Sequence, residues 1–525
     1  MHHLCGTAWL FCVALVHAQD VQKHEKIDDG LNGALPVPVF VRMADQLLAG
    51  SGDHEAFCHR NAQRRRSELR VEVVKTLRAK AEKSWAAVAD LVGQLTMDGG
   101  VSEVHRYWII NGFACSASRQ ACERLAAHDA VGFVYRQTLP SHYTGVVRAS
   151  AQRPSRSRPR GRRDLQAALD MREKEEPFSM EGLEVPWNLE RIRADKAWVE
   201  EGVTGEGVVV ALMDSGLQVT PALAKALWRN ADEVLDGKDS DGNGFVDDLF
   251  GYDFASDSGE CLGDGDPSHG SFCGGIIAGR PTAEQPMVTG VAPRARLMVI
   301  RGTGRLRAYE YALANGADIL SMSFTWSGRQ LGNYRGVYRL IHEHLDAAGV
   351  LSVGGAGNYA LSIPPGRQIA LPKDIPCVIA AAGILKSGER APPSSRGPCQ
   401  WAGVVYYDDY PPEAPLEKPD VTGVFGGYPV WGKDSSRRRW RKLFETASKD
   451  GALIVGPQGN SFSGPHAAGV AALMWSANRE LLPSQVKALM EETCLDIGES
   501  GRDLDFGAGL LQADAAVRAA KANSK

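Results

Sequence analysis

Residues 208–216 read VVVALMDSG, and this stretch decides the expected fold. Six apolar residues run without interruption into an aspartate, and a Ser-Gly pair that favours a turn follows at once. A short continuous apolar run that ends at a turn signal is consistent with a strand buried on both faces. Such strands belong to parallel sheets covered by helices, so we expect Asp214 to stand at the carboxyl end of one of them.

Apolar runs of the same kind recur further along the chain, with helical stretches between several of them. They are ARLMVIR (295–301), ADILSMSF (317–324), GVLSVGGAG (349–357) and CVIAAAGI (377–384). Alternation of strands and helices predicts an α/β fold with a mostly parallel central sheet. Binding sites in such sheets form just beyond the carboxyl ends of strands, which draws attention to Asp214, Ser323 and Asn358.

Two further stretches carry side chains that could act in chemistry. DPSHGSFCGGIIAG places His269 at the start of a glycine-rich helix, and GNSFSGPHAAG (459–469) places Ser461 just ahead of an apolar run. Ser461 could equally be a helix cap, and His269 could be a structural histidine. Asp214 and Asn358 could simply form turns. Each of these signals is weak when it is taken alone.

Together the four residues supply one of each group that serine catalysis needs. A serine hydroxyl is a poor nucleophile until a base removes its proton, and a neutral histidine can be that base. A carboxylate orients the histidine ring, and an amide donor meets the developing oxyanion. In chain order the candidates are Asp214, His269, Asn358 and Ser461.

With these motifs in this order, the chain resembles the subtilases, the subtilisin-like serine peptidases, and most of all their bacillopeptidase F-like branch. The order Asp, His, Ser is that of subtilisin. The motifs that carry the resemblance are DSG (214–216), HGSFCGG (269–275), AGN (356–358) and GNSFSGPHAAG, with echoes in GVAPRARL (290–297), ILSMSF (319–324), SSRGP (394–398), KPDV (418–421) and FGAGLLQADAAV (506–517). The resemblance covers about residues 185–520. It implies a subtilisin-like three-layer fold.

The resemblance also implies a role for each motif residue. Ser461 would be the nucleophile, His269 the general base and acid, and Asp214 its orienting carboxylate. Asn358 and the backbone N–H of Ser461 would donate to the oxyanion. Ser323 and Gly355 match strand-edge positions that pair with the backbone of an extended substrate. We therefore expect a serine endopeptidase that cleaves polypeptides through an acyl-enzyme intermediate and needs no cofactor for its chemistry.

Several positions depart from the family pattern and support alternatives. Phe272 replaces the second histidine of its motif, and Asn460, Phe462 and Ser463 flank Ser461 with unusual choices. These substitutions motivate a second hypothesis, a catalytically impaired pseudoenzyme that serves as a binding or scaffold module. A third, an α/β-hydrolase esterase, conflicts with Ser463, which stands where the GxSxG elbow needs a glycine.

The N-terminal part of the chain divides into segments of different character. Residues 1–18 have the apolar centre and Val-His-Ala end of a signal peptide cleaved after Ala18, and a short segment, 19–35, follows. Residues 36–140 predict a ferredoxin-like βαββαβ unit, similar to the inhibitor and chaperone propeptide of the family. Residues 141–184 are an Arg- and Pro-rich segment, expected to be extended, exposed and cut during maturation. Its alternative role is a tether to nucleic acid or an anionic surface. From the resemblance we expect residues 185–525 to form the peptidase domain.

Composition and hydropathy indicate which kinds of partner and which cellular compartment to expect. The net charge of −4 gives the whole chain no nucleic-acid footprint. Beyond the signal no stretch is apolar enough to anchor the chain in a membrane, so we expect a secreted protein, extracellular or periplasmic, and a monomer. Its partners are then polypeptide substrates and its own propeptide. Cys273 follows His269 by four residues and is either an inert apolar side chain or a free reactive thiol.

The acidic stretch DGKDSDGNGFVDD (236–248) suggests a cation site. Asp239, Asp241 and Asn243, followed by a glycine, match the first half of a calcium loop. Phe250 stands where the loop needs a bidentate glutamate, so the pattern is incomplete. We expect a shortened structural calcium site that adds Asp247 or Asp248. An acidic turn without metal is the open alternative.

Overall fold

The computed structural model describes residues 26–29, 31, 36–138, 158–172, 179, 181–263, 269–282, 286–326, 331–431, 445–446, 453–455 and 458–523. The expected signal peptide and most of the segment after it lie outside the described residues. We refer to residues 36–138 as the N-terminal domain and to the described residues from 181 onward as the main domain.

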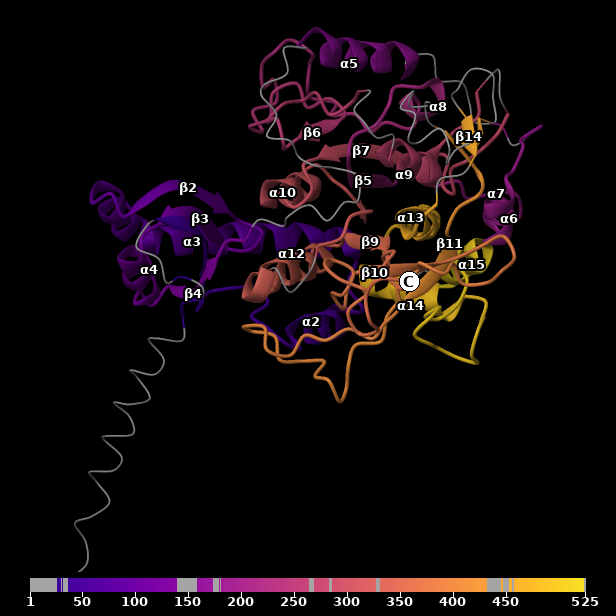
Figure 1. Cartoon of the computed structure of the whole chain (residues 1–525). Helices are drawn as coiled ribbons and strands as arrows, with labels where there is room; N and C mark the ends of the chain where they lie inside the picture. The colour runs from indigo at the N-terminus through magenta and orange to yellow at the C-terminus, as the bar shows by residue number, and fades with distance from the viewer. Residues whose placement is uncertain are drawn as a thin grey trace, which may run out of the picture.

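A seven-stranded sheet forms the centre of the main domain, in the order β11-β10-β9-β8-β5-β7-β6 (Figure 1). Every neighbouring pair in it is parallel. The strands are β5 (Val209–Asp214), β6 (Gly251–Asp253), β7 (Arg296–Arg301), β8 (Ile319–Met322), β9 (Leu351–Gly355), β10 (Ile379–Ile384) and β11 (Val421–Val424). The predicted α/β class with a mostly parallel sheet is confirmed.

Helices cover both faces of this sheet, which makes three layers. Along β5, Val210 and Leu212 point into one core, and Ala211 and Met213 point into the other. This alternation is the strand period of two, with both faces buried. On the first face lie α6 (Trp187–Arg191), α7 (Ala194–Val199), α8 (Pro221–Ala224), α9 (His269–Ala278), α13 (Asn460–Ala477), α14 (Pro483–Glu492) and α15 (Ala513–Ala522). On the second lie α10 (Leu306–Ala314), the turn η1 (Gly332–Tyr334) and α12 (Arg335–Ala347).

The N-terminal domain is a four-stranded antiparallel sheet in the order β2-β3-β1-β4, with helices on it. Its elements are β1 (Val37–Met43), α2 (Asp53–Asn61), α3 (Arg66–Met97), β2 (Val101–Tyr107), β3 (Gly112–Ala117), α4 (Arg119–Ala126) and β4 (Val131–Arg136). The predicted βαββαβ order is present, with α2 as an additional helix. Val39 and Val41 face the domain's own core, whereas Phe40 between them faces the main domain.

The N-terminal sheet packs against α10, η1 and α12, at the left of Figure 1. Phe40 and Tyr135 meet Tyr334 with ring centroids 6.2 and 6.3 Å apart. At the start of α3, Arg66 forms a buried ion pair with Asp318, N to O 2.6 Å. The two domains therefore share one apolar core and a buried charge pair.

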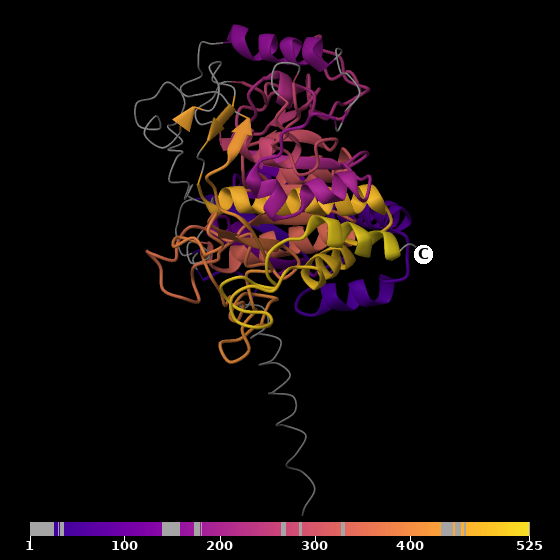
Figure 2. The ribbon, with the colours of Figure 1, turned by 90° about the vertical axis from the view of Figure 1, so that its right-hand side faces the viewer.

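The sequence predicts that the segment before the main domain is extended. The structure differs, because part of this segment is helical. Residues 158–172 form a helix, α5 (Arg158–Arg172), which lies across the top of the molecule in Figure 2. Leu165 and Ala168 on it are buried in the core that includes α8. Apolar residues three and four positions apart share one helix face, and here α8 covers that face. The expectation of an exposed linker was wrong for this helix, while residues 139–157 lie outside the described part.

Candidate active site

Asp214 and His269 form the best-defined pair of the site. Asp214 ends β5, and His269 begins α9. The imidazole Nδ1 lies 2.9 Å from Oδ1 and 3.0 Å from Oδ2 of the carboxylate. The Ser215 backbone N–H donates to Asp214 Oδ1 over 2.6 Å, which fixes the carboxylate further. This arrangement fixes which ring nitrogen carries the proton and leaves Nε2 for another partner.

The charges of this pair stabilise each other in a buried setting. Burial disfavours the charge of Asp214, but His269 and the hydrogen bonds around the carboxylate hold its pKa below the ordinary value. Burial lowers the pKa of His269, but Asp214 and the neighbouring Cys273 together raise it more, so that pKa stands well above 6.5. The pair therefore favours the charged imidazolium, the state that a histidine reaches when it accepts a proton.

Ser461 is the second residue of α13, at the end of the helix that faces this pair. Its Oγ donates to the Ser323 carbonyl over 3.4 Å, and the Ser323 hydroxyl donates to the Ser461 carbonyl over 2.6 Å. Within the described residues no hydrogen bond joins the Ser461 hydroxyl to His269. Such contacts are often long in free enzymes and shorten in the substrate complex. The Phe462 ring lies 5.4 Å from the His269 ring, between centroids.

Asn358 lies beside the turn that leads into α13. Its Oδ1 accepts the backbone N–H of Asn460 over 2.8 Å. Gly459 has φ 146°, and a Cβ there would come 3.4 Å from Asn358 Nδ2. Because the oxygen of the amide is occupied, its N–H groups remain for a ligand next to Ser461.

The residues that depart from the family pattern support the turn rather than disrupt it. The Asn460 side chain donates to the Gly357 carbonyl (2.7 Å) and to Ser394 Oγ (2.9 Å). Ser463 Oγ in turn donates to Asn460 Oδ1 over 3.2 Å. The unusual serine is thus part of a hydrogen-bonded brace beneath Ser461.

Phe272 and Phe462, the two aromatic departures, pack on each other. Their ring centroids lie 6.2 Å apart, and both side chains are buried. Cys273 fills the space between α9 and α13: its thiol donates to the Ser461 carbonyl over 3.4 Å and lies 3.9 Å from His269 Nδ1. Burial raises the pKa of this thiol, which keeps it protonated.

The two expected substrate-pairing residues have different surroundings. Ser323 follows β8 and touches Ser461, as described above. Gly355 ends β9, where it pairs with Ala381 of β10. A Cβ on Gly355 would meet the Asn460 carbonyl at 1.8 Å, so the glycine allows α13 to approach the sheet closely. Ser323 thus borders the reacting region, and Gly355 lies beneath it.

Three carboxylates converge in and near the acidic loop: Glu233, Asp241 and Asp248, with one oxygen of each within 4.8 Å of the others. Asp248 is fully buried and accepts from Tyr311 Oη (2.8 Å) and Asn230 Nδ2 (2.9 Å). Burial raises its pKa to about 6. Sequence reasoning missed Glu233, because it precedes the loop pattern and is brought back only by the folding of the chain.

The other expected metal residues serve the loop itself. Asp239 accepts the backbone N–H groups of Asn243 (3.0 Å) and Gly244 (2.8 Å). Asp247 accepts those of residues 236 and 237, over 3.0 and 2.9 Å. The Asn243 amide donates to Asp241 (2.9 Å) and Asp248 (3.0 Å). Of the residues named from the sequence, Asp241 and Asp248 belong to the carboxylate cluster, whereas Asp239, Asn243 and Asp247 do not.

Comparisons with known proteins identify a family and several relatives. The sequence model described as the Subtilase family matches residues 205–509. The chain is 25% identical to bacillopeptidase F of Bacillus subtilis (strain 168) over 472 residues, which are 86% of this chain and 29% of that protein. It is 26% identical to subtilisin DY of Bacillus licheniformis over 347 residues, 64% of this chain and 99% of that protein.

A solved structure, the crystal structure of MycP1 with the N-terminal propeptide removed, matches with a TM-score of 0.44 at 22% identity, over 63% of this chain and 96% of that one. The chain spans less than a third of the length of bacillopeptidase F. Among the helices of the described residues, none has the length and apolar character needed to cross a membrane.

Proposed function

The chain belongs to the subtilase family, and from this we propose that it is a serine endopeptidase acting through Asp214, His269 and Ser461. The observation that carries the proposal is the Asp214–His269 pair, 2.9 Å apart, whose imidazole lies beside the first turn of α13, 5.4 Å from the ring of Phe462, the residue after Ser461. Asn358 beside that helix end supplies the fourth group, an amide donor.

The proposed reaction begins when a peptide carbonyl reaches Ser461. His269 Nε2 accepts the proton of the hydroxyl as Oγ bonds to the carbonyl carbon. The oxygen of that carbonyl gains negative charge, which the Asn358 amide and the Ser461 backbone N–H stabilise. That N–H lies in the first turn of α13, where N–H groups have no acceptor within the helix.

His269 then returns the proton to the departing amine, and the C–N bond breaks to leave an acyl-enzyme. Water repeats the sequence in reverse: His269 takes a proton from water, the hydroxide attacks the ester, and Ser461 leaves with that proton. Asp214 does not accept a proton. It orients the ring and stabilises the imidazolium in both halves of the reaction.

We further propose that the protein is made as an inactive, secreted precursor. The N-terminal domain would assist folding and block the cleft until it is cut away within residues 141–184. Its support is the shared core with α10 and α12 and the buried pair of Arg66 with Asp318. The proposed partners are polypeptide substrates and this domain itself, and the proposed active form is a monomer without nucleic-acid or membrane partners.

For the carboxylate cluster we propose a structural calcium ion, with no cofactor for the chemistry. Glu233, Asp241 and Asp248 offer hard oxygen ligands, the kind that calcium prefers. In the described part of the chain no lysine or arginine is paired with these three. An ion held there would neutralise their charge and fix the loop against Tyr311 of α10.

The second candidate function is the binding or scaffold module without catalysis. The observation in its favour is that, among the described residues, the Ser461 hydroxyl donates to the Ser323 carbonyl and not to His269, while the Phe462 ring lies 5.4 Å from the imidazole. A fluorophosphonate probe reacts with an activated serine and separates the two. Labelling of the matured protein at Ser461 supports the peptidase, and failure to label supports the scaffold.

The main test compares the wild-type chain with Ser461→Ala on casein. We expect cleavage by the wild type and none by the variant, which should also accumulate as the uncut precursor. Equal cleavage by the two proteins would remove Ser461 from the mechanism. Mass spectrometry of the secreted product would read its N-terminus and test the maturation segment at the same time.

A further inference from the structure

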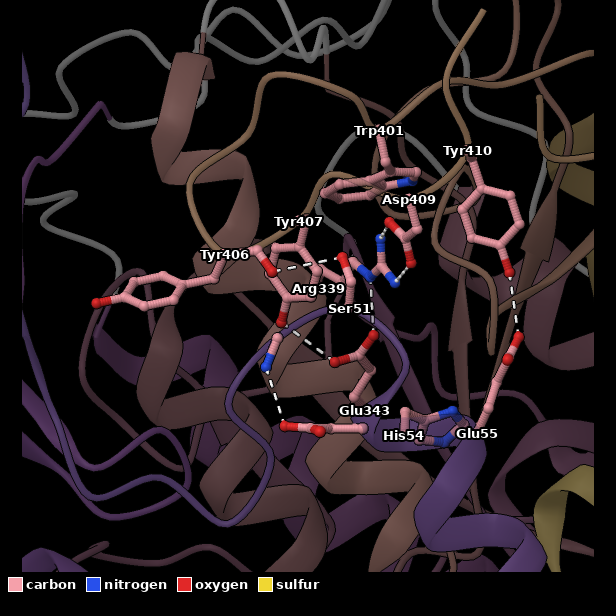
Figure 3. A network of polar contacts seen from close by, with 12 residues as sticks. Ser51, His54, Glu55, Arg339, Glu343, Trp401, Tyr406, Tyr407, Asp409 and Tyr410 are labelled. Carbon is pink, nitrogen blue, oxygen red and sulfur yellow. Dashed lines mark hydrogen bonds and ion pairs between the residues drawn. The ribbon is translucent and has the colours of Figure 1, made fainter. Parts of the chain in front are cut away.

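Three metal-binding side chains meet where the N-terminal domain contacts the main domain. His54 and Cys58 lie four residues apart on α2, and Asp346 lies on α12. His54 Nε2 is 2.8 Å from Asp346 Oδ1, Cys58 Sγ is 3.4 Å from the same Nε2, and Sγ is 3.7 Å from Oδ1. In Figure 3, α2 brings His54 and Glu55 up to the helix that carries Arg339 and Glu343.

The three atoms converge on one point instead of forming a relay. In a nucleophile–histidine–carboxylate relay, the two ring nitrogens have different partners. Here the thiol and the carboxylate both approach Nε2. Three different ligand types around one small volume is the arrangement expected of a metal site.

The Cys58 group differs from the superficially similar group at the active site. His269 and Cys273 are also four residues apart and also near a carboxylate. There, too, the thiol lies near the ring nitrogen that faces the carboxylate, 3.9 Å from His269 Nδ1, but this contact is the longer one, and the thiol donates to the Ser461 carbonyl over 3.4 Å. The thiol of Cys58, in contrast, is hydrogen-bonded to the other two members of its own group, His54 and Asp346. It also contacts the Ser484 side chain at the start of α14.

The chemistry of the donors favours zinc over calcium. Thiolate and imidazole are preferred by borderline and soft metals, and a carboxylate oxygen completes three protein ligands. A divalent ion, a thiolate, a carboxylate and a neutral imidazole sum to zero charge. That balance suits a place where the Asp346 and His54 side chains are only 6% and 13% exposed.

The distances require only a small adjustment. Around a tetrahedral zinc, ligand atoms lie about 3.3–3.6 Å apart, from bond lengths of about 2.0–2.3 Å. The contacts that involve sulfur already measure 3.4 and 3.7 Å. The His54–Asp346 contact of 2.8 Å must open by about 0.5 Å as the ion replaces their shared proton. A fourth position stays for water.

We propose that His54, Cys58 and Asp346 bind a zinc ion that clamps the N-terminal domain to the main domain. Binding displaces the thiol proton of Cys58, and the proton that His54 shares with Asp346, to solvent. The ion should also delay release of the N-terminal domain from the main domain. That consequence rests on the proposed function, in which this domain is the inhibitor. The metal site itself does not depend on it.

The test uses the full chain as Ser461→Ala, so that no arm depends on catalysis, with a thiol-free reductant and added zinc chloride. We expect one zinc ion per chain by titration against a chromophoric chelator. Cys58→Ser and Asp346→Asn should each weaken binding about 10–100-fold or more. Cys494→Ser is the matched control, because that partly buried thiol donates only to a helix carbonyl, over 3.2 Å, and it should bind as the parent does.

Cobalt gives a second, independent readout. Cobalt(II) at the site should show a sulfur-to-metal charge-transfer band that Cys58→Ser removes and Cys273→Ser leaves. Two results overturn the proposal: zinc binding that both Cys58→Ser and Asp346→Asn retain, or a cobalt band that disappears with Cys273→Ser instead. Absence of binding to the parent chain overturns it as well. None of these results bears on the peptidase proposal, which the casein comparison decides.

Discussion

The thiol of Cys273 donates a hydrogen bond to the backbone carbonyl of Ser461, with Sγ 3.4 Å from the oxygen. This contact ties α9, which carries His269, to the first turn of α13. The helices that carry the proposed base and the proposed nucleophile are thus joined directly by this contact. The contact is buried, since Cys273 has no exposed surface.

Replacing Cys273 should therefore affect stability according to what replaces it. Cys273→Ser keeps a donor of similar size, whereas Cys273→Ala leaves a buried carbonyl with one donor fewer and a small cavity. We expect Cys273→Ala to lower the free energy of unfolding by about 1–3 kcal/mol, and Cys273→Ser by clearly less. Urea unfolding in the Ser461→Ala background measures both without self-digestion. Equal losses for the two variants would show that the hydrogen bond does not matter.

Asn358→Ala should reduce turnover without weakening substrate binding. In the proposed mechanism the amide acts on charge that develops only in the transition state, so its loss should lower kcat about 10²–10³-fold and leave KM nearly unchanged. Steady-state kinetics on a chromogenic peptide measure this split. A rise in KM with constant kcat would instead make Asn358 a ground-state binding residue.

The pH dependence of activity follows from the Asp214–His269 pair. His269 must be neutral to accept the Ser461 proton, and Asp214 and Cys273 together raise the pKa of His269 well above 6.5. The acid limb of the kcat/KM profile should therefore lie above pH 6.5, with activity rising as pH increases through it. In Asp214→Asn the limb should move to lower pH, while kcat falls about 10⁴-fold. If the acid limb of the Asp214→Asn profile does not shift, a group other than His269 controls it.

Calcium should stabilise the chain through Asp248. A chelator should lower the unfolding temperature, calcium should restore it, and Asp248→Asn should remove the calcium-dependent part. Each kcal/mol of calcium binding corresponds to about 1–2 °C in a domain larger than about 300 residues. Because burial raises the pKa of Asp248 to about 6, the effect should fade as pH drops through that value and the carboxylate takes up a proton. Asp90→Asn on the exposed side of α3 is the control, with no change expected.

Arg66→Ala should loosen the contact between the domains. Its guanidinium pairs with Asp318 in a buried setting, and removing one partner of a buried pair costs about 3–5 kcal/mol. Arg479 also contacts Asp318, at 3.0 Å, so we expect about 3 kcal/mol. Arg64→Ala breaks an exposed pair with Glu72, which water and salt screen, and should leave the free energy of unfolding almost unchanged. Denaturant unfolding of both in the Ser461→Ala chain distinguishes them, and equal effects would contradict this account.

The sheet could be predicted because its strands carry their signal locally. VVVALMD and its counterparts are continuous apolar runs, and the burial of Val210 and Ala211 in opposite cores is what such runs encode. The position of Asp214 at a strand end followed directly. The order of strands and helices in the N-terminal domain was also predicted from the sequence, except for α2.

What the sequence did not reveal depends on contacts between distant segments. Leu165 and Ala168 of α5 are hidden among arginines and prolines, and their burial is decided by α8, which lies far along the chain. Glu233 joins the carboxylate cluster only because the loop folds back on it. The spacing of Asn460 and Ser463 could suggest an unusual site, but not the brace that they form with Gly357 and Ser394.

The start of α3 has a consequence for the order of events during synthesis. Ser67 donates to Glu480 over 2.9 Å, a contact across 413 residues. A ribosome that adds about 5–20 residues per second needs about 20–80 s to span that distance. The N-terminal domain, which has its own core around Val39 and Val41, emerges first and has time to fold while its partner is still being made. The contact with Glu480 can therefore form only after that residue has been made, when the N-terminal domain has long since left the ribosome.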